Sequence, residues 1–309
     1  MAVTLSQAQA LTQDKLVKGI IEELIKQSPL MARYPFVELN SSGITINRED
    51  EDNMGSVGFY APDGIWVESS AATTPATFRL TVLGGQCDVP GLYQRSMSNI
   101  NDQMAEQVKI KTKLMAHTFD RTVIYGNDDN KNEFDGLHVL IPSGQQVHLG
   151  SGSTGAALTF KALDQLVGKV KGGKPDLLLM NSDIHIVLTN KLRTMGALNL
   201  SKDEFGELWT VWGNNIPIIV TDWIPQTETI SGGAYSAETG GNTSSIFAIR
   251  FGAGDGLAGL QNGGIATKYW EDLEDKDAAR TRIRWYVGQI LYSTKAVAVL
   301  DGVTADDMS

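Results

Sequence analysis

The feature that most constrains this chain is one long helical pattern between Ser98 and Tyr125. It opens on N-cap residue types and contains neither proline nor glycine before Gly126. Its apolar residues recur at steps of four or seven residues, which keep them on one face of a helix: Met104, Val108, Met115, Phe119 and Val123. Such a helix would be about 40 Å long, which is more than a compact domain needs. We predict a helix that runs beneath a broad, shallow body, with an ordinary surface helix as the alternative.

The same pattern has a charged side. We assign the following residues to its polar face: Glu106, Lys109, Lys111, Lys113, Asp120 and Arg121. Because only one stripe is apolar, the prediction is a helix with one face buried and the other in water.

Both flanks of this helix lack residues for a core of their own. Residues 6–28 predict an amphipathic helix that ends at Ser28-Pro29, and its apolar face includes Ile20, Ile21, Leu24 and Ile25. Its lysines are offset by acidic residues, which argues against a membrane-surface helix. Residues 43–93 predict short strands, such as those at 44–46 and 77–82, with few positions able to form a core. We therefore expect the first segment to dock on another surface, and the second to be an arm stabilised by another chain.

Beyond a Gly/Ser stretch at residues 150–155, the pattern becomes mixed α/β. Helices are predicted from Thr159 to Val170 and from a cap at Ser182, with buried strands at 176–180, 216–220 and 246–249. The C-terminal part predicts strands at 266–272, 280–292 and 296–300. The fold class expected from these elements is α+β.

The net charge of the chain argues against tight binding of nucleic acid. The formal net charge is −10, whereas phosphate binding needs clustered lysine and arginine. Arg280, Arg282 and Arg284 are the local exception, and strand alternation puts them on one face with Ile283 and Trp285 on the other. We predict a solvated or inter-subunit strand face there, with nucleic-acid contact as the alternative.

The sequence contains a partial match to a cofactor-binding motif, but the residues around it do not fit such a site. Gly254–Gly259 fits G-x-G-x-x-G, but the glycine-rich residues 261–264 follow where a helix should receive a pyrophosphate, so we predict a loop. The four histidines share no metal-ligand spacing, and the single cysteine, Cys87, excludes an internal disulfide. We predict no catalytic residue, no metal and no cofactor. The alternative is an α/β enzyme centred on residues 151–264 with Asp176 or Asp183 near a pocket.

The order of these pieces resembles one family, the tailed-phage major capsid proteins with the Hong Kong 97 fold. The resemblance rests on Leu11–Glu22 through Ser28-Pro29-Leu30, Asn47–Glu49, Gln94–Ser96, Asn101–Gln103, Ile124–Gly126, Glu133–Leu137 and Tyr292–Val303. It implies an N-terminal arm (1–40), an extended loop (41–93), a peripheral domain with the long spine helix (94–150 and 265–309) and an axial domain (151–264).

The resemblance also implies a structural role in the virion. Subunits would form pentamers and hexamers of an icosahedral shell around double-stranded DNA, which they would touch only weakly. The shell would assemble in the host cytoplasm without a membrane, together with portal and possible decoration proteins. Because the arm pattern begins within ten residues of Met1, scaffolding is expected to be a separate protein or unnecessary. An encapsulin-like compartment around a cargo enzyme is the alternative within this fold.

Two details concern contacts between subunits. Some relatives join subunits by an isopeptide bond from a loop lysine, but this chain has no lysine between Lys26 and Lys109, so we expect non-covalent contacts. The acidic run of Glu49, Asp50, Glu51 and Asp52 repels itself, so it is either a solvated tip or docks on Arg280, Arg282 or Arg284 of a neighbour.

Overall fold

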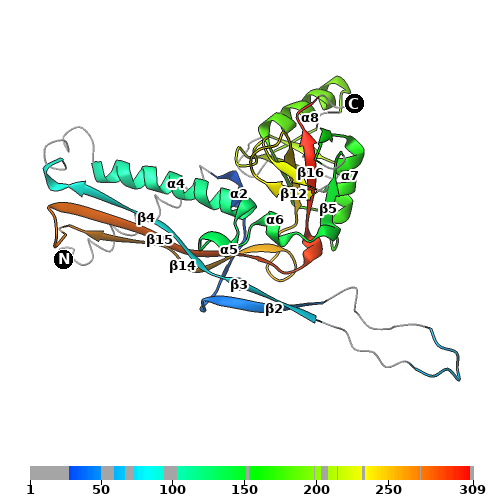
Figure 1. Cartoon of the computed structure of the whole chain (residues 1–309), viewed down its shortest axis with the longest axis horizontal. Coiled ribbons are helices and arrows are strands. Elements are labelled where there is room, and N and C mark those ends of the chain that lie inside the picture. The colour runs from blue at the N-terminus through cyan, green and yellow to red at the C-terminus, as the bar shows by residue number, and fades with distance from the viewer. Residues whose placement is uncertain are drawn as a thin grey trace.

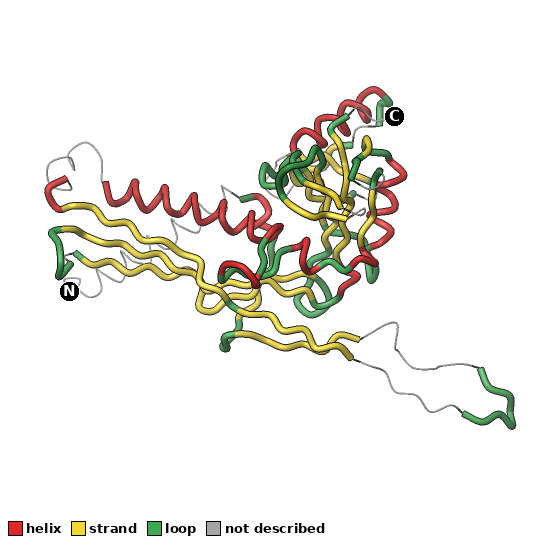
Figure 2. Tube along the Cα trace, in the orientation of Figure 1, coloured by secondary structure: helices red, strands yellow, loops and turns green. Residues whose placement is uncertain are grey.

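The computed structural model describes residues 28–49, 59–66, 73–93, 103–150, 153–197, 199–202, 208–213, 215–231, 234–271 and 273–306. A long flat unit made of one helix and a four-stranded sheet joins an α/β unit at one end, and a β-hairpin projects from the region between them (Figures 1 and 2). The α+β class predicted from the sequence is confirmed.

Helix α4 (Gln103–Tyr125) is the predicted long helix, and its 23 residues correspond to about 34 Å. Residues 98–102 of the predicted pattern lie outside the described residues. The apolar stripe is confirmed, since Val108, Met115, Phe119 and Val123 are all buried. This stripe packs on a sheet with the order β1-β14-β15-β4, made of β1 (Phe36–Glu38), β14 (Leu257–Trp270), β15 (Ala278–Leu291) and β4 (Thr81–Pro90).

The assignment of Asp120 to the polar face was wrong. Its side chain is 4% exposed, and its Oδ1 accepts a hydrogen bond from Ser28 Oγ at 2.6 Å. Asp120 follows Ala116 by four residues and precedes Val123 by three, and both of these are fully buried. Helical geometry therefore puts the carboxyl on the buried face, whatever its charge.

The expectation that residues 43–93 could hardly form a core was also wrong for part of that segment. Strand β4 pairs with β15 from Thr81↔Val287 to Pro90↔Ala278. Because its side chains alternate between the two faces, Cys87 and Val89 are buried. The projecting part is the hairpin of β2 (Gly43–Glu49) and β3 (Thr73–Arg79), as the sequence predicted.

The α/β unit contains an eight-stranded sheet in the order β5-β16-β13-β7-β10-β9-β8, with β6 also paired to β16. Its strands are β5 (Gln146–His148), β6 (Ala156–Ala157), β7 (Leu177–Met180), β8 (Leu200–Lys202), β9 (Leu208–Trp212), β10 (Ile216–Val220), β13 (Ser244–Ile249) and β16 (Val297–Thr304). Strand β7 is buried on both faces, which fits its unbroken run of apolar residues.

Two helices cover one face of this sheet, α7 (Phe160–Lys169) and α8 (Ser182–Thr194). Thr159 caps α7 as predicted, with Ala162 N donating to its Oγ1 at 3.2 Å. Helix α8 is capped by Asn181 and not by Ser182, because the Asn181 side chain accepts from Asp183 N at 2.7 Å.

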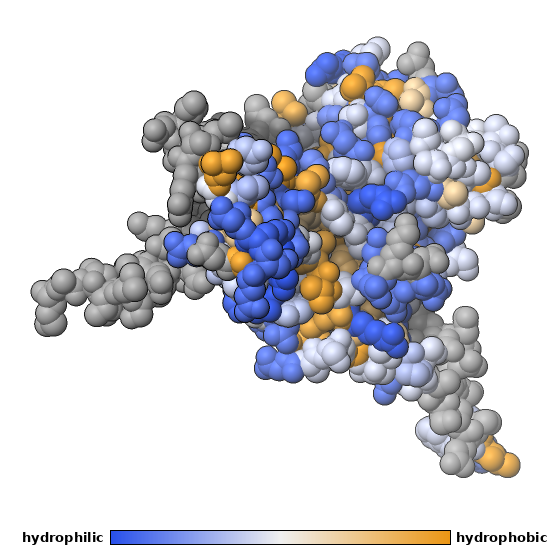
Figure 3. Space-filling view, turned by 60° about the vertical axis from the view of Figure 1, so that its left-hand side comes forward, coloured by the Kyte–Doolittle hydropathy of each residue, from blue (hydrophilic) through white to orange (hydrophobic). Residues whose placement is uncertain are grey.

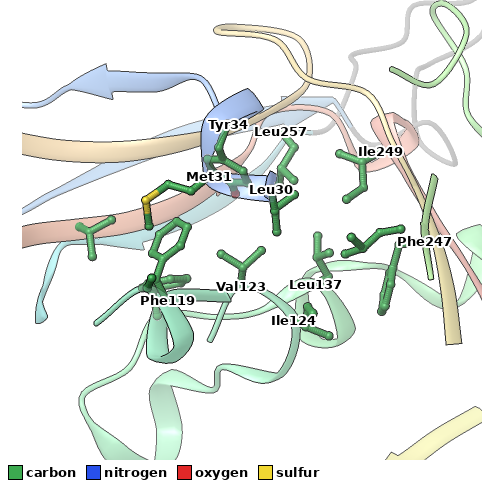
Figure 4. Packing of buried hydrophobic residues seen from close by; sticks show 14 of the residues in the cluster. Leu30, Met31, Tyr34, Phe119, Val123, Ile124, Leu137, Phe247, Ile249 and Leu257 are labelled. Atoms are coloured by element: carbon green, nitrogen blue, oxygen red, sulfur yellow. The ribbon is translucent and has the colours of Figure 1, made fainter. Parts of the chain in front are cut away.

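The two units share one hydrophobic core. Alternate residues of β7 and β13, such as Leu179 and Phe247, lie on the face of the sheet opposite α7 and α8. They belong to the cluster that also contains Phe119 and Val123 of α4. Figure 4 shows this cluster, in which residues of α2 (Pro29–Arg33), α4, β13 and β14 pack together with Leu137 from α6 (Leu137–Leu140). This shared core fixes the α/β unit to the end of α4.

The glycine-rich loop expected at Gly254–Gly259 is a turn only at residues 254–256, and a strand follows it. Strand β14 begins at Leu257, and its register with β15 shifts between Asn262 and Ile265. Gly263 and Gly264 occupy this bulge with φ of 67° and 65°, a region that favours glycine. A strand thus follows the G-x-G-x-x-G residues, where a pyrophosphate site needs a helix. Within the described residues, no helix has the length and apolar character needed to cross a bilayer.

Candidate assembly surfaces

Ser28 is held in place by hydrogen bonds to α2 and α4. Ser28 is fully buried and caps α2, accepting a hydrogen bond from Met31 N at 3.0 Å while donating one to Asp120. Burial raises the pKa of Asp120 to about 7, and the hydrogen bond from Ser28 lowers it in part. Because Leu30 and Met31 of α2 belong to the core, Ser28 is fixed to the body of the subunit.

Aromatic packing and strand pairing hold the next residues. The Tyr34 ring meets Phe119 edge-on at 5.9 Å, and the Phe36 ring lies 5.2 Å from Trp285. Strand β1 then runs parallel to β14, with Phe36 opposite Gly259. A Cβ at Gly259 would lie 2.4 Å from the Phe36 ring, so only glycine leaves room for that ring. The predicted arm residues Ile20, Ile21, Leu24 and Ile25 lie outside the described residues.

The hairpin exposes its apolar tip. Phe59, Ile65 and Trp66 have relative exposures of 110%, 90% and 78%, so the described part of their own subunit gives them almost no cover. The Trp66 ring stacks on Tyr60 with centroids 4.7 Å apart. Hydrophobic side chains are visible at the end of this projection in Figure 3. Large exposed apolar patches are typical of surfaces that pack on another molecule.

The acidic run begins where strand β2 ends. Glu49 is the last residue of β2, while Asp50 and Asp52 lie outside the described residues. The candidate contact between this run and a neighbouring subunit therefore remains a prediction.

The outer face of the four-stranded sheet carries the predicted arginines. Arg282 and Arg284 are exposed, whereas Ile283 and Trp285 are buried, so the predicted alternation is confirmed. Arg282 lies over the Trp270 ring at 5.3 Å and Arg284 over the Tyr286 ring at 5.9 Å. This sheet face combines positive charge with aromatic surface.

Arg280 differs from the other two because it has an acidic partner in its own subunit. Its Nε and Nη2 each donate to Asp88 at 2.7 Å, and Lys276 Nζ lies 2.5 Å from the same carboxylate. Hydrogen bonds from Arg280, and then from Lys276, hold the pKa of Asp88 well below its usual range. Arg282 and Arg284 are therefore the better candidates for contact with another subunit.

Groups of three or more histidine, cysteine or acidic side chains arranged as metal ligands do not occur in the described part of the chain. The Cys87 thiol is buried between α4 and the sheet, near Met104 Sδ at 3.9 Å. Asp176 accepts a hydrogen bond from Phe251 N at 2.7 Å and thus fixes a turn beside β13. Such contacts are structural.

Comparison with solved structures assigns this fold. The chain resembles the encapsulin in the holo-SrpI complex from Synechococcus elongatus PCC 7942 with a TM-score of 0.68 and 19% identity, covering 91% of this chain and 89% of that one. It resembles the capsid of the native GTA particle with a TM-score of 0.60 and 16% identity, covering 90% and 91%. A Mycobacterium phage Adephagia structure gives 0.59 and 14%, covering 90% and 89%. The fold is the Hong Kong 97-like fold of these shells.

Sequence comparison adds the family. The sequence model of the SU10 major capsid protein family matches residues 86–227, from β4 through α4 into the α/β unit. This match and the phage capsid structures above support a tailed-phage major capsid protein. A search of curated protein sequences finds no match to this capsid protein. The family match and the capsid structures agree with the family and the structural role expected from the sequence.

Proposed function

We propose that the capsid protein forms pentamers and hexamers that close into an icosahedral shell around double-stranded DNA. The observation that carries this proposal is the hairpin, whose apolar tip the described part of its own subunit leaves uncovered. A projection from one subunit that fits a different surface on the next gives a heterologous contact, and rotation of such contacts closes into rings. The net charge of −10 favours only weak contact between the shell and packaged DNA.

Within this proposal, the subunit divides as the resemblance implied. Residues 1–40 would serve as the arm, 41–93 as the extended loop, 94–150 and 265–309 as the peripheral domain, and 151–264 as the axial domain. Strand β4 stays with the peripheral sheet through its pairing with β15. Scaffolding, portal and decoration proteins, and assembly in the host cytoplasm, belong to the same proposal.

The hairpin tip provides the first test. The double variant Phe59→Ser/Trp66→Ser is expected to fold normally but to give open rings or free subunits in place of closed shells. Each apolar side chain that becomes covered contributes roughly 1.5–3 kcal/mol, and the loss repeats in every subunit. Negative-stain microscopy and light scattering would measure assembly, and circular dichroism would measure folding.

The matched control for this test is Asp63→Ser, a polar change in the same exposed loop. It is expected to assemble like the wild type. Closed shells from the Phe59→Ser/Trp66→Ser variant at the wild-type concentration would show that the tip is not an assembly contact.

Charge complementarity suggests where the acidic run after strand β2 docks. The acidic run from Glu49 to Asp52 is negatively charged, whereas Arg282 and Arg284 are positively charged and exposed on the outer face of the four-stranded sheet. We propose that they meet between neighbouring subunits. A solvated acidic tip is the alternative, and both predict normal folding of the single subunit.

Salt sensitivity separates these alternatives. Asp50→Lys/Asp52→Lys is expected to lower the salt concentration at which shells dissociate, because the contact becomes repulsive within a Debye length of about 10 Å. Arg282→Glu/Arg284→Glu should do the same, and the combined variant should regain part of the loss. Lys161→Glu on α7 is the control for a change in net charge alone. If the Asp50→Lys/Asp52→Lys variant dissociates at the same salt concentration as the wild type, the acidic run is a solvated tip and not a contact.

An encapsulin-like compartment is the second candidate, favoured by the TM-score of 0.68 to an encapsulin. The contents of the shell distinguish the two. Particles purified from their native source should hold nuclease-protected double-stranded DNA if the proposal is right, and one co-purifying protein species if the shell is a compartment.

A further inference from the structure

A buried polar cluster lies where the C-terminal end of α4 meets the eight-stranded sheet. Its members come from six segments: Tyr125 (α4), His138 (α6), Glu228, Tyr235 of β12 (Ala234–Ala237), Ser245 (β13) and Asp301 (β16). Glu228 is 2% exposed and Asp301 is 1% exposed, so both carboxyls lie out of water. Buried acids need hydrogen bonds, an opposite charge or a proton.

The hydroxyl of Ser245 joins the two carboxyls. Its Oγ lies 2.5 Å from Glu228 Oε2 and 3.0 Å from Asp301 Oδ1. A serine hydroxyl has one proton to donate. If both carboxyls were ionised, one of these two contacts would bring lone pairs together with no proton between them. The geometry therefore requires a second proton in the cluster, carried by one of the carboxyls.

Asp301 is the better place for that proton. Glu228 already accepts a hydrogen bond from the Tyr125 hydroxyl, and His138 Nε2 lies 3.6 Å from the same oxygen. Asp301 Oδ2 is buried and has no hydrogen-bond partner among the described residues, although His148 Nδ1 lies 3.7 Å away. The missing hydrogen bond penalises an ionised carboxylate. Burial raises the pKa of Asp301, and the nearby His138 lowers it only in part.

We propose that one proton on Asp301 closes a latch between the spine helix and the sheet. Asp301 Oδ1–H donates to Ser245 Oγ, Ser245 Oγ–H donates to Glu228, and the Tyr125 hydroxyl donates to Glu228 from α4. When the proton leaves, Ser245 has two acceptors and one proton, and two buried negative charges face each other. Repulsion then separates Glu228, with the end of α4, from β16.

The direction of the pH effect follows from this chemistry. Because the folded-state pKa of Asp301 is raised, the latch contributes fully below the ordinary pKa of an aspartate and is lost as the pH rises through the raised value. The other groups around it are Tyr125, Tyr235, His138, His148 and the Arg121–Glu238 ion pair. Burial raises the pKa of both tyrosines, so they stay protonated, and Arg121 balances Glu238 at 2.7 Å.

Infrared spectroscopy of the full-length protein tests where the proton lies. Asp120→Asn is used as the background, so that the Asp120 carboxyl does not contribute. At neutral pH we expect the carbonyl stretch of a protonated carboxyl, which Asp301→Asn removes. Absence of the band, or a band that remains in Asp301→Asn, would overturn the assignment to Asp301.

A third variant covers the case in which Asp301→Asn does not fold. Ser245→Ala removes the acceptor of the Asp301 proton, so the carbonyl band should shift in frequency. A band that Ser245→Ala leaves in place would contradict the hydrogen-bonded chain. These spectra are measured on subunits or particles alike, so their outcome does not depend on whether a shell forms.

Hydrogen exchange tests the latch itself. Once intrinsic rates are corrected, amides at residues 122–125 of α4 should lose protection as the pH rises in the wild type and keep it in Asp301→Asn. His138→Gln and His148→Gln, measured beside it, report any titration of the histidines that contact the carboxyls. The same loss of protection in Asp301→Asn as in the wild type would contradict the latch.

Discussion

At pH 8 the Asp120→Asn subunit is expected to be more stable than the wild type by up to about 4 kcal/mol, and at pH 4 the two should be alike. Burial raises the pKa of Asp120 from 3.8 to about 7. Each unit of difference between the folded and unfolded values corresponds to about 1.4 kcal/mol. Asparagine still accepts the hydrogen bond from Ser28 Oγ and has no proton to lose.

The sign follows from which state ionises first. Between pH 4 and pH 7 the unfolded chain releases the Asp120 proton while the folded subunit keeps it, so the wild type loses stability across this window. Urea unfolding of unassembled subunits at pH 4, 6 and 8 would measure the effect. Asp63→Asn, a change of the same type at an exposed site, is the control. A difference between Asp120→Asn and the wild type that does not vary with pH would contradict this account.

The sequence predicted those parts of the fold that depend on local periodicity. The stripe through Phe119 and Val123 and the alternation around Ile283 are set by helix and strand geometry, so the pattern alone reveals them. Asp120 was assigned to the polar face because its side chain is charged. Its position around the helix axis, which decides the face, places it among the buried residues. Its partner Ser28 lies 92 positions away, and only the tertiary fold brings the two together.

The candidate surfaces were predictable to different degrees. The Arg280, Arg282 and Arg284 face follows from alternation, but the cross-strand pairing of Asp88 with Arg280 needs the register of β4 on β15. Strand β4 was assigned to the projecting loop. Its small and polar residues do not give the apolar alternation by which a half-buried strand is normally recognised. The latch joins Tyr125, Glu228 and Asp301, which no sequence spacing relates. Long-range polar contacts of this kind leave no periodic signal.

Two truncations that differ only by residues 28–35 are expected to have opposite effects on folding. Deletion of residues 1–27 should leave a folded subunit, because Ser28 keeps its cap and its bond to Asp120. Deletion of residues 1–35 also removes Leu30, Met31 and Tyr34 from the core, where they are 3%, 8% and 5% exposed. At roughly 1.5–3 kcal/mol each, the loss is about 5–9 kcal/mol, as large as the stability of many domains.

The shorter deletion separates folding from assembly. If the arm face of Ile20, Ile21, Leu24 and Ile25 packs on other subunits, the chain without residues 1–27 should melt like the wild type and yet form no closed shells. Circular dichroism and negative-stain microscopy on the same sample would show both properties. Normal shells from this truncation would make the arm dispensable, and a wild-type melting curve for the chain without residues 1–35 would contradict its anchoring role. Ser28→Ala in the full-length chain completes the series, since it removes both the cap of α2 and the donor to Asp120 while keeping every apolar contact.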